Sequence, residues 1–188
     1  EAKWLNIDIT DNWNIAPHDL VIVSYVLNEL PQEYIEKVIC KLWESTADKL
    51  VIIEPGTSAG FSRIKQARER LIASGAKTIA PCPHNHLCPM NENDWCHFSQ
   101  RFSRSKLHRL VKSVELAYED EKFSYICLSR TSQTIITIDG VVIRHPQIRK
   151  GHIQLDLCAV DGLKKITVTR AEKEVFKKAR KLKWGSIL

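Results

Sequence analysis

The pattern of apolar and polar positions predicts alternating strands and helices over the first third of the chain. Residues 18–30 (HDLVIVSYVLNEL) and 48–56 (DKLVIIEPG) are rich in apolar side chains, which is typical of strands in a buried parallel sheet. Residues 32–46 and 62–75 carry apolar side chains at helical spacing, and we expect Ser62 to cap the second helix. This order predicts an α/β fold with a parallel sheet and crossover helices. On the first helix, the apolar face comprises Ile35, Val38, Ile39 and Leu42.

The last third of the chain has the pattern of an antiparallel β unit. Residues 134–144 and 151–170 have β-hairpin character, and Asp139-Gly140 and Asp161-Gly162 supply the expected turns. The chain closes with a basic helix over 171–184. A small antiparallel β unit with a basic C-terminal helix is therefore expected here.

Two structural units follow from this change of pattern. We expect an α/β domain over 1–130 and the β unit over 131–188, with the boundary near 130–139. The first unit also contains a strand over 122–130 and an amphipathic helix over 103–115. The apolar side of that helix comprises Leu107, Leu110, Val111 and Val114.

The net charge of +6 is concentrated in the β unit. Residues 140–188 hold 12 Lys and Arg against 4 Asp and Glu, a net charge of +8, so the remainder of the chain carries −2. A basic segment of this kind favours polyanionic partners, of which RNA and DNA are the commonest. A solvated, lysine-rich terminal helix is the alternative that composition leaves open.

Composition also bounds the compartment. The longest apolar run, around 20–27, is interrupted by Ser24 and Tyr25 and is too short to span a bilayer, so we expect no membrane association. The N-terminal sequence EAKWLNIDIT lacks the basic and apolar segments of a signal peptide. We therefore expect a reducing compartment, in which cysteines remain free thiols.

Three of the six cysteines lie within residues 80–101 (APCPHNHLCPMNENDWCHFSQR). Cys82, Cys88 and Cys96 follow a C-x5-C-x7-C spacing, which differs from the C-x2-C knuckle of common zinc modules. A disulfide knot, a catalytic thiol and a metal site are the competing interpretations, and the reducing compartment weakens the first. A tetrahedral metal site would need a fourth ligand. The candidates are His84, His86, His97, Cys127 and Cys158.

The local sequence distinguishes these candidates in part. Cys127 lies inside an apolar strand and Cys40 on a helix near its apolar stripe, so both are expected to be small core residues. Cys158 stands at a strand end before a turn, where it can face an adjoining loop. Cys82 and Cys88 are each followed by proline, as is the last cysteine of the bacterial ferredoxin motif, which favours an iron–sulfur cluster. All-thiolate ligation suits zinc as well.

Several segments resemble known proteins. DLVIVSYVLNELP (19–31) resembles the fourth strand and following loop of class I S-adenosylmethionine-dependent methyltransferases, and LVIIEPGTSAGFSRIKQAR (50–68) resembles their fifth strand and helix. More specific segments together resemble the methyltransferase-like family of mitochondrial small-ribosomal-subunit (Rsm-type) proteins and their bacterial relatives over nearly the whole chain. These segments are APCPHNHLCP, WCHFSQR, YEDEKFSYICLSR, RHPQIRKGHIQLDLC and ARKLKWG.

The resemblance implies a metal cluster and a partner. It implies a [4Fe–4S] cluster and a protein that contacts small-subunit rRNA during ribosome assembly, and zinc is the alternative that the thiolate donors leave open. The compartment would be a bacterial cytoplasm or the mitochondrial matrix. The implied cluster ligands are Cys82, Cys88, Cys96 and Cys158.

The resemblance also implies a Rossmann-like methyltransferase fold, from which the chain departs at one place. No G-x-G motif precedes residues 19–26, so we expect the chain to begin about halfway through that fold. By itself it is then expected neither to bind S-adenosylmethionine tightly nor to turn over. Asn28 and Glu29 are the candidate cofactor residues. An active rRNA methyltransferase, with the missing half supplied upstream, and a zinc-stapled nucleic-acid-binding module are the alternative functions.

Basic residues that flank the implied cluster are the candidate RNA contacts. If the cluster joins the two units, we expect these residues to form one surface that binds phosphates. They are Arg101, Arg104, Lys106, Arg109, Arg144, Arg149, Lys150 and His152.

Overall fold

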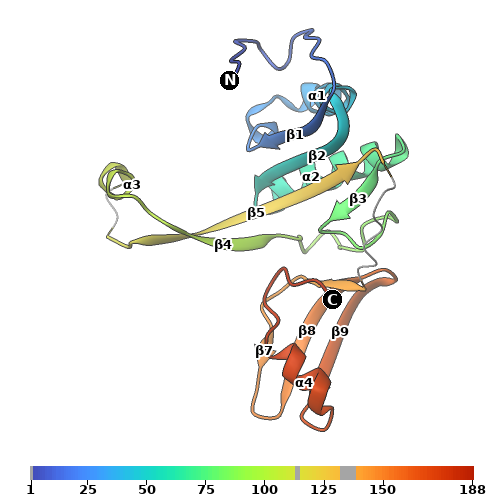
Figure 1. The fold of residues 1–188 in the computed structure, drawn as a ribbon, viewed down its shortest axis with the longest axis vertical. Coiled ribbons are helices and arrows are strands. Elements are labelled where there is room, and N and C mark those ends of the chain that lie inside the picture. The colour runs from blue at the N-terminus through green and yellow to red at the C-terminus, as the bar shows by residue number, and fades with distance from the viewer. Residues whose placement is uncertain (1, 113–114, 132–138) are drawn as a thin grey trace.

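Two β-sheets form the framework of the protein in a computed structural model that describes residues 2–112, 115–131 and 139–188 (Figure 1). The first sheet has five strands in the order β1-β2-β5-β3, and β4 pairs with β5 along the same edge as β3. Its strands are β1 (His18–Ser24), β2 (Thr46–Pro55), β3 (Lys77–Ala80), β4 (Phe98–Ser103) and β5 (Tyr118–Ser129).

The first sheet is mixed, whereas the sequence pattern predicts a parallel one. β1 and β2 are parallel, but β5 runs antiparallel to β2, β3 and β4. The predicted strand over 122–130 is present, and its direction could not be read from its apolar pattern. A mixed sheet in an α/β unit is consistent with a Rossmann-like fold.

Two helices pack against the core of the first sheet. Their bounds are α1 (Gln32–Glu44) and α2 (Ser58–Ala73). The predicted face of α1 is confirmed, because all its apolar residues are buried in one core with Leu50 and Ile126 of the sheet. None of the helices in the described residues is both long and apolar enough to cross a membrane.

The predicted cap of the second helix is wrong. α2 begins one turn before Ser62, and Thr57 is its N-cap, with a side chain that accepts a hydrogen bond from the backbone N–H of Gly60 at 3.1 Å. The earlier start buries Phe61 on the helix face that packs inward. Gly75 follows the helix with a φ of 91°, as expected of a C-terminal stop.

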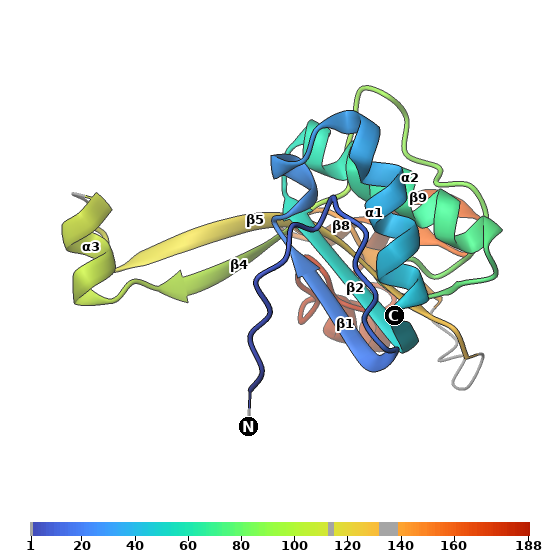
Figure 2. The ribbon, with the colours of Figure 1, turned by 90° about the horizontal axis from the view of Figure 1, so that it is seen from above.

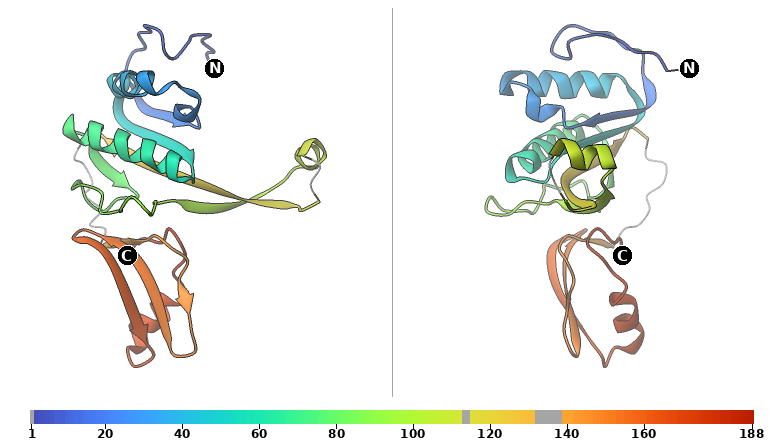
Figure 3. Two further views of the ribbon diagram at one scale, coloured as in Figure 1. Left: turned by 180° about the vertical axis from the view of Figure 1, so that it is seen from behind. Right: turned by 90° about the vertical axis from the view of Figure 1, so that its left-hand side faces the viewer.

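The second sheet and α4 (Lys173–Ala179) form the β unit (Figure 3). β6 and β7 lie along one edge of β8 and β9 along the other, and α4 packs on one face through Ala179. The predicted hairpin over 151–170 is confirmed. The strands are β6 (Gly140–Val142), β7 (Gln147–Ile148), β8 (His152–Ala159) and β9 (Gly162–Thr169).

Other predictions for the β unit are changed or lie outside the described residues. The first arm of the hairpin expected over 134–144 falls largely on 132–138, and so does the predicted boundary between the units. Gly140 starts β6 and pairs with Ala159 instead of occupying a turn. The terminal helix is shorter than the 171–184 expected.

A long arm projects from the first sheet (Figures 1 and 2). It consists of β4, the first half of β5 and α3 (Lys106–Lys112) at its tip. The helix is shorter than the predicted 103–115. The apolar side chains Leu107, Leu110 and Val111 are more than two-thirds exposed, at 71%, 77% and 75%. Val114 lies outside the described residues.

Gly60 places α2 against the end of β2, and its replacement should test this contact. A Cβ at Gly60 would lie 2.0 Å from the carbonyl oxygen of Pro55, whereas one at Gly151 would meet nothing within 4 Å. We expect Gly60→Ala to lower the free energy of unfolding by about 1–3 kcal/mol through overpacking. Gly151→Ala should change it by less than about 0.5 kcal/mol. Urea unfolding of both variants is the measurement, and equal losses would contradict the contact.

Candidate metal centre

One cavity is lined by four cysteines that come from both units of the protein. Cys82, Cys88 and Cys96 belong to the segment between β3 and β4, and Cys158 belongs to β8. The remaining walls come from α2, β5, β9 and the same segment between β3 and β4, and they are mainly apolar. They include Phe61, Ile64, Met90, Tyr125, Ile126 and Leu163.

The topology of the first sheet explains how three of these cysteines reach the cavity. β3 pairs with residues 127–129 of β5, and β4 pairs with residues 118–123 on the same edge. The chain leaves this edge after Ala80 and returns at Phe98, so the intervening cysteine segment (81–97) emerges beside Tyr125. The fourth cysteine arrives from the β unit, because Cys158 lies near the end of β8.

Most of the other candidate ligands lie outside the lining of this cavity. Cys127 is half-buried in β5, between Val51 and Ala80, and does not line the cavity. His84 is buried, and its Nε2 lies 3.9 Å from Sγ of Cys158. His86 stacks on His84, and His97 stacks on Trp95, outside the cavity lining. Of the five candidates for a fourth ligand, Cys158 therefore lines the cavity and His84 lies beside it.

Burial makes three of the cavity thiols weaker acids. Removal from water raises the pKa of Cys82 and of Cys96, and it raises the pKa of Cys158 to about 12. Repulsion from neighbouring thiolates adds to the effect, and the positive charge of Arg68 opposes it at Cys82 and Cys158. Because a metal binds the thiolate, loading this site must release protons, and metal affinity should fall as the pH is lowered.

The thiols line the cavity without meeting at one point. In the parts of the chain that the structure describes, no three His, Cys, Asp or Glu side chains are grouped as a single metal ion would need. Zn–S bonds of about 2.3 Å require tetrahedral sulfur ligands about 3.8 Å apart. A single-ion site is therefore not preassembled in this arrangement.

A buried arginine on α2 also lines the cavity, and sequence reasoning missed it. The side chain of Arg68 is 2% exposed, and its Nη2 donates to the carbonyl oxygens of His84 at 2.8 Å and His86 at 2.7 Å. The signal was present in the sequence, since Arg68 follows Phe61 and Ile64 at helical spacing along the face that packs inward.

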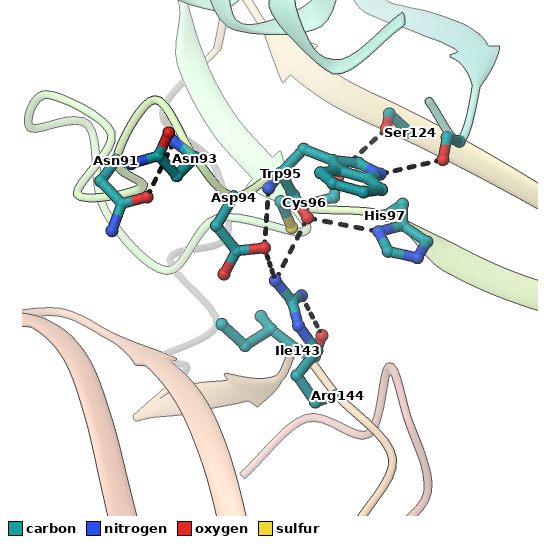
Figure 4. Close-up of polar contacts among 10 residues, drawn as sticks. Asn91, Asn93, Asp94, Trp95, Cys96, His97, Ser124, Ile143 and Arg144 are labelled. Atoms are coloured by element: carbon teal, nitrogen blue, oxygen red, sulfur yellow. Dashed lines mark hydrogen bonds and ion pairs between the residues drawn. The ribbon is translucent and has the colours of Figure 1, made fainter. Parts of the chain in front are cut away.

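Polar contacts join the two units beside the cavity (Figure 4). Arg144 forms an ion pair with Asp94 and donates to the carbonyl oxygen of Trp95 at 3.3 Å. The indole N–H of Trp95 donates to the carbonyl of Gly56 at 3.0 Å, and Ser124 Oγ donates to that of Cys96 at 2.8 Å. These bonds fix the end of the cysteine segment against both the first sheet and the β unit.

Aromatic contacts extend the same joint. The ring of Trp184, after α4, meets His97 edge-on at 4.9 Å and His145 at 4.6 Å. Phe98 at the start of β4 packs against Val141 of β6. Apolar burial at this joint therefore helps to hold the β unit against the first sheet.

The candidate RNA contacts on the arm fall into two groups. Nε and Nη2 of Arg101 each donate to the carboxylate of Asp120 at 2.7 Å, and Nε of Arg104 donates to Glu119 at 3.1 Å. Both guanidinium groups are therefore largely neutralised by carboxylates of β5. Lys106 and Arg109 lie on α3 at the tip of the arm.

The candidates in the β unit lie elsewhere, so the predicted single basic surface is not formed. Arg144 is paired with Asp94 beside the cavity. Arg149 and Lys150 are exposed in the turn between β7 and β8, and His152 starts β8. This turn is at the end of the β unit remote from the first sheet, far from α3 (Figure 1).

The candidate cofactor residues lie at the carboxyl ends of β1 and β2. Asn28 and Glu29 belong to a 3-10 helix, η1 (Leu27–Glu29), and the Asn28 amide donates to the Glu29 carboxylate. The fully buried carboxylate of Glu54 accepts the N–H of Leu27 at 3.0 Å, and burial raises its pKa. The two strand ends therefore meet, as expected of a sheet of this kind. Cofactor binding by Asn28 and Glu29 stays a prediction.

Comparisons with known proteins agree on one family. Residues 1–188 match the family described as mitochondrial small ribosomal subunit Rsm22. The chain is 30% identical over 187 residues to the human mitochondrial ribosome assembly protein METTL17, covering 90% of this chain and 39% of that protein.

Two fungal relatives extend this finding. A mitochondrial Rsm22-cox11 tandem protein of Schizosaccharomyces pombe is 28% identical over 216 residues, covering 90% of this chain and 29% of that protein. The mitochondrial ribosome assembly protein RSM22 of Saccharomyces cerevisiae is 24% identical over 177 residues, covering 59% of this chain and 28% of that protein. The chain thus spans well under half the length of these relatives.

The Arg144–Asp94 ion pair should couple the two units measurably. In a double-mutant cycle with Arg144→Met and Asp94→Asn, we expect a coupling energy of about 0.5–1 kcal/mol, because the pair is only partly buried. Arg144→Met alone should cost more than Asp94→Asn, since it also removes the bond to Trp95. Urea unfolding measures all four proteins. The more exposed Arg70–Glu36 pair is the control, and an equal coupling there would contradict a special role.

Proposed function

Because the chain belongs to the Rsm22 family of mitochondrial small-ribosomal-subunit proteins, we propose that it binds small-subunit rRNA during ribosome assembly and carries a structural [4Fe–4S] cluster. The observation that supports the cluster is the convergence of four cysteines from two units on one cavity. The names of the relatives support the assembly role, and they favour mitochondria over a bacterial cytoplasm.

The donor set of the cavity fits an iron–sulfur cluster. Such clusters are held by four cysteine thiolates, and the residues that would hold one here are Cys82, Cys88, Cys96 and Cys158. Pro83 and Pro89 follow two of them and restrict the backbone beside each ligand. The apolar walls formed by Phe61, Ile64 and Met90 keep water away from the thiolates. The group would link the cysteine segment to β8 and so stabilise the folded protein, because metal binding favours the state in which all the ligands are brought together.

The charge distribution refines where rRNA would bind. Arg149 and Lys150 are exposed and form no ion pair among the described residues, whereas Arg101 is already paired with Asp120. A Lys or Arg side chain without an ion-pair partner releases counterions when it binds a phosphate of the RNA. A side chain that is already ion-paired contributes less to the binding free energy. We therefore assign the main phosphate contacts of the β unit to the turn between β7 and β8, and a separate contact to α3.

Replacement of one cysteine in each unit tests the cluster. Cys158→Ser should remove most of the bound iron and labile sulfide and lower the melting temperature of the anaerobically purified protein. Cys127→Ser, outside the cavity, should retain both. Each kcal/mol of lost stability corresponds to about 2–4 °C for a chain of this size. Equal losses of iron, sulfide and melting temperature in the two variants would contradict the ligand assignment. Stoichiometric zinc instead of iron in the wild-type protein would show that the site binds zinc and not a cluster.

Salt dependence tests the rRNA contacts. For the double variant Arg149→Gln/Lys150→Gln, the plot of log affinity for a small-subunit rRNA transcript against log salt should lose about 1.4–1.8 units of slope, corresponding to two phosphate contacts. Arg101→Gln is the control and should leave the slope nearly unchanged, because Asp120 already neutralises its charge. Filter binding at several salt concentrations measures both. An unchanged slope in the double variant would place the rRNA contacts elsewhere.

A further inference from the structure

Arg68 is a buried cation without a carboxylate partner. Its side chain is 2% exposed, yet among the described residues no Asp or Glu lies within ion-pair distance of it. Its Nη2 donates to two carbonyl oxygens, it also contacts the Cys82 thiol, and its Nε has no hydrogen-bond partner among the described residues. Burying an unpaired charge is costly, so such a residue calls for an anion nearby.

The anion that would satisfy this charge belongs in the cavity. Arg68 lines it together with all four cysteines. Metal coordination deprotonates thiols outright, so four coordinated cysteines around a dipositive core carry a net negative charge. The other cation in the lining, Lys65, is half-buried on the same helix and lies one turn nearer its N-terminus.

We propose that Arg68 is the buried counter-charge of the thiolate-bound group and positions the loop that carries its ligands; this inference rests on the proposed metal centre. The two carbonyls that its guanidinium binds belong to His84 and His86, which lie between the ligands Cys82 and Cys88. Both bonds come from Nη2, so one guanidinium group holds the loop in place and brings positive charge to the thiolates. A lysine would keep the charge on a side chain of different shape.

The geometry also links Arg68 to the ligand in the other unit. His84, whose carbonyl accepts from Arg68, places its Nε2 3.9 Å from Sγ of Cys158. Displacement of the loop would therefore disturb the contact between the cysteine segment and β8. Arg68 acts through these groups and through its charge, and we regard it as a positioning residue.

Comparison of the metal-loaded and metal-free protein distinguishes two roles of Arg68. In one it balances the charge of the bound group, and in the other, called a clamp below, it only binds the loop carbonyls. Arg68→Met removes the charge and the donors while keeping most of the volume. In the loaded protein it should lower the free energy of unfolding. In the metal-free protein, which lacks the anion, the same change should be neutral or stabilising, because an uncompensated buried charge is removed. Equal destabilisation of both forms would show a clamp alone and overturn the proposal.

The reduction potential supplies a readout that a clamp would not move. In Arg68→Met the proposed cluster loses a nearby cation, and its reduced state, which is the more negative one, should become less favourable. The expected change of the reduction equilibrium is about tenfold, which corresponds to 59 mV for one electron. Arg68→Lys keeps the charge, and its reduction equilibrium should stay within about twofold of that of the wild type. If Arg68→Met does not fold, a tenfold change of the reduction equilibrium in Arg68→Lys overturns the counter-charge role by itself. Arg70→Met, on the same helix with Glu36 as its exposed partner, is the control and should change neither readout.

The outcomes for the inference and for the proposed function are distinguishable. Wild-type protein that binds neither iron nor zinc refutes the metal centre, and with it the role of Arg68. Wild-type protein loaded with zinc refutes the cluster, but the stability comparison still tests Arg68, since zinc with four thiolates is also anionic. Iron-loaded protein in which Arg68→Met changes neither stability nor potential refutes only the inference.

Discussion

The β unit is too small to depend on its own core, and the rest of the arrangement follows from this constraint. Its buried apolar cluster consists of six residues from β6, β8, β9 and α4. Units of about 50 residues bury too small a fraction of their surface to be more than marginally stable, and they commonly rely on a disulfide, a metal or a neighbouring domain. Here Cys158, Arg144 and Trp184 all face the first sheet or the cysteine segment. The joint therefore contributes to the stability of the unit as well as to its placement.

The charged groups at this joint differ between its exposed side and the buried cavity. At its outer side, Arg144 and Asp94 form a partly exposed ion pair, which water and salt can screen. In the cavity, Arg68 is a buried cation and the surrounding acidic groups are thiols rather than carboxylates. Buried thiols can exist uncharged, whereas carboxylates at the same depth would need partners at all times. In our proposal, such a site can fold before it is loaded, and it acquires its full charge balance only when the proposed metal group is bound.

Local signals in the sequence were sufficient for several of the regular elements. The apolar runs gave β1, β2 and the buried face of α1, and Cys158 was separated from Cys127 by its place at a strand end. Features that depend on long-range pairing were missed. The antiparallel direction of β5 arises from its pairing with the distant β2, and β4 arises from a pairing with β5 that 14 intervening residues, 104–117, separate in the chain. The exposure of Leu107 on the arm likewise cannot be read from an amphipathic pattern, which marks an apolar face but not what covers it.

X-ray absorption at the iron edge of the anaerobically purified protein tests the central claim most directly, because it reports both the metal and its ligands. The account predicts iron coordinated by sulfur alone, with short iron–iron vectors, and loss of one cysteine ligand when Cys158 is replaced. A protein with no iron edge, or one whose only metal is zinc with sulfur neighbours at about 2.3 Å, would contradict the cluster. Iron coordination unchanged by the replacement of Cys158 would contradict the claim that the site joins the two units.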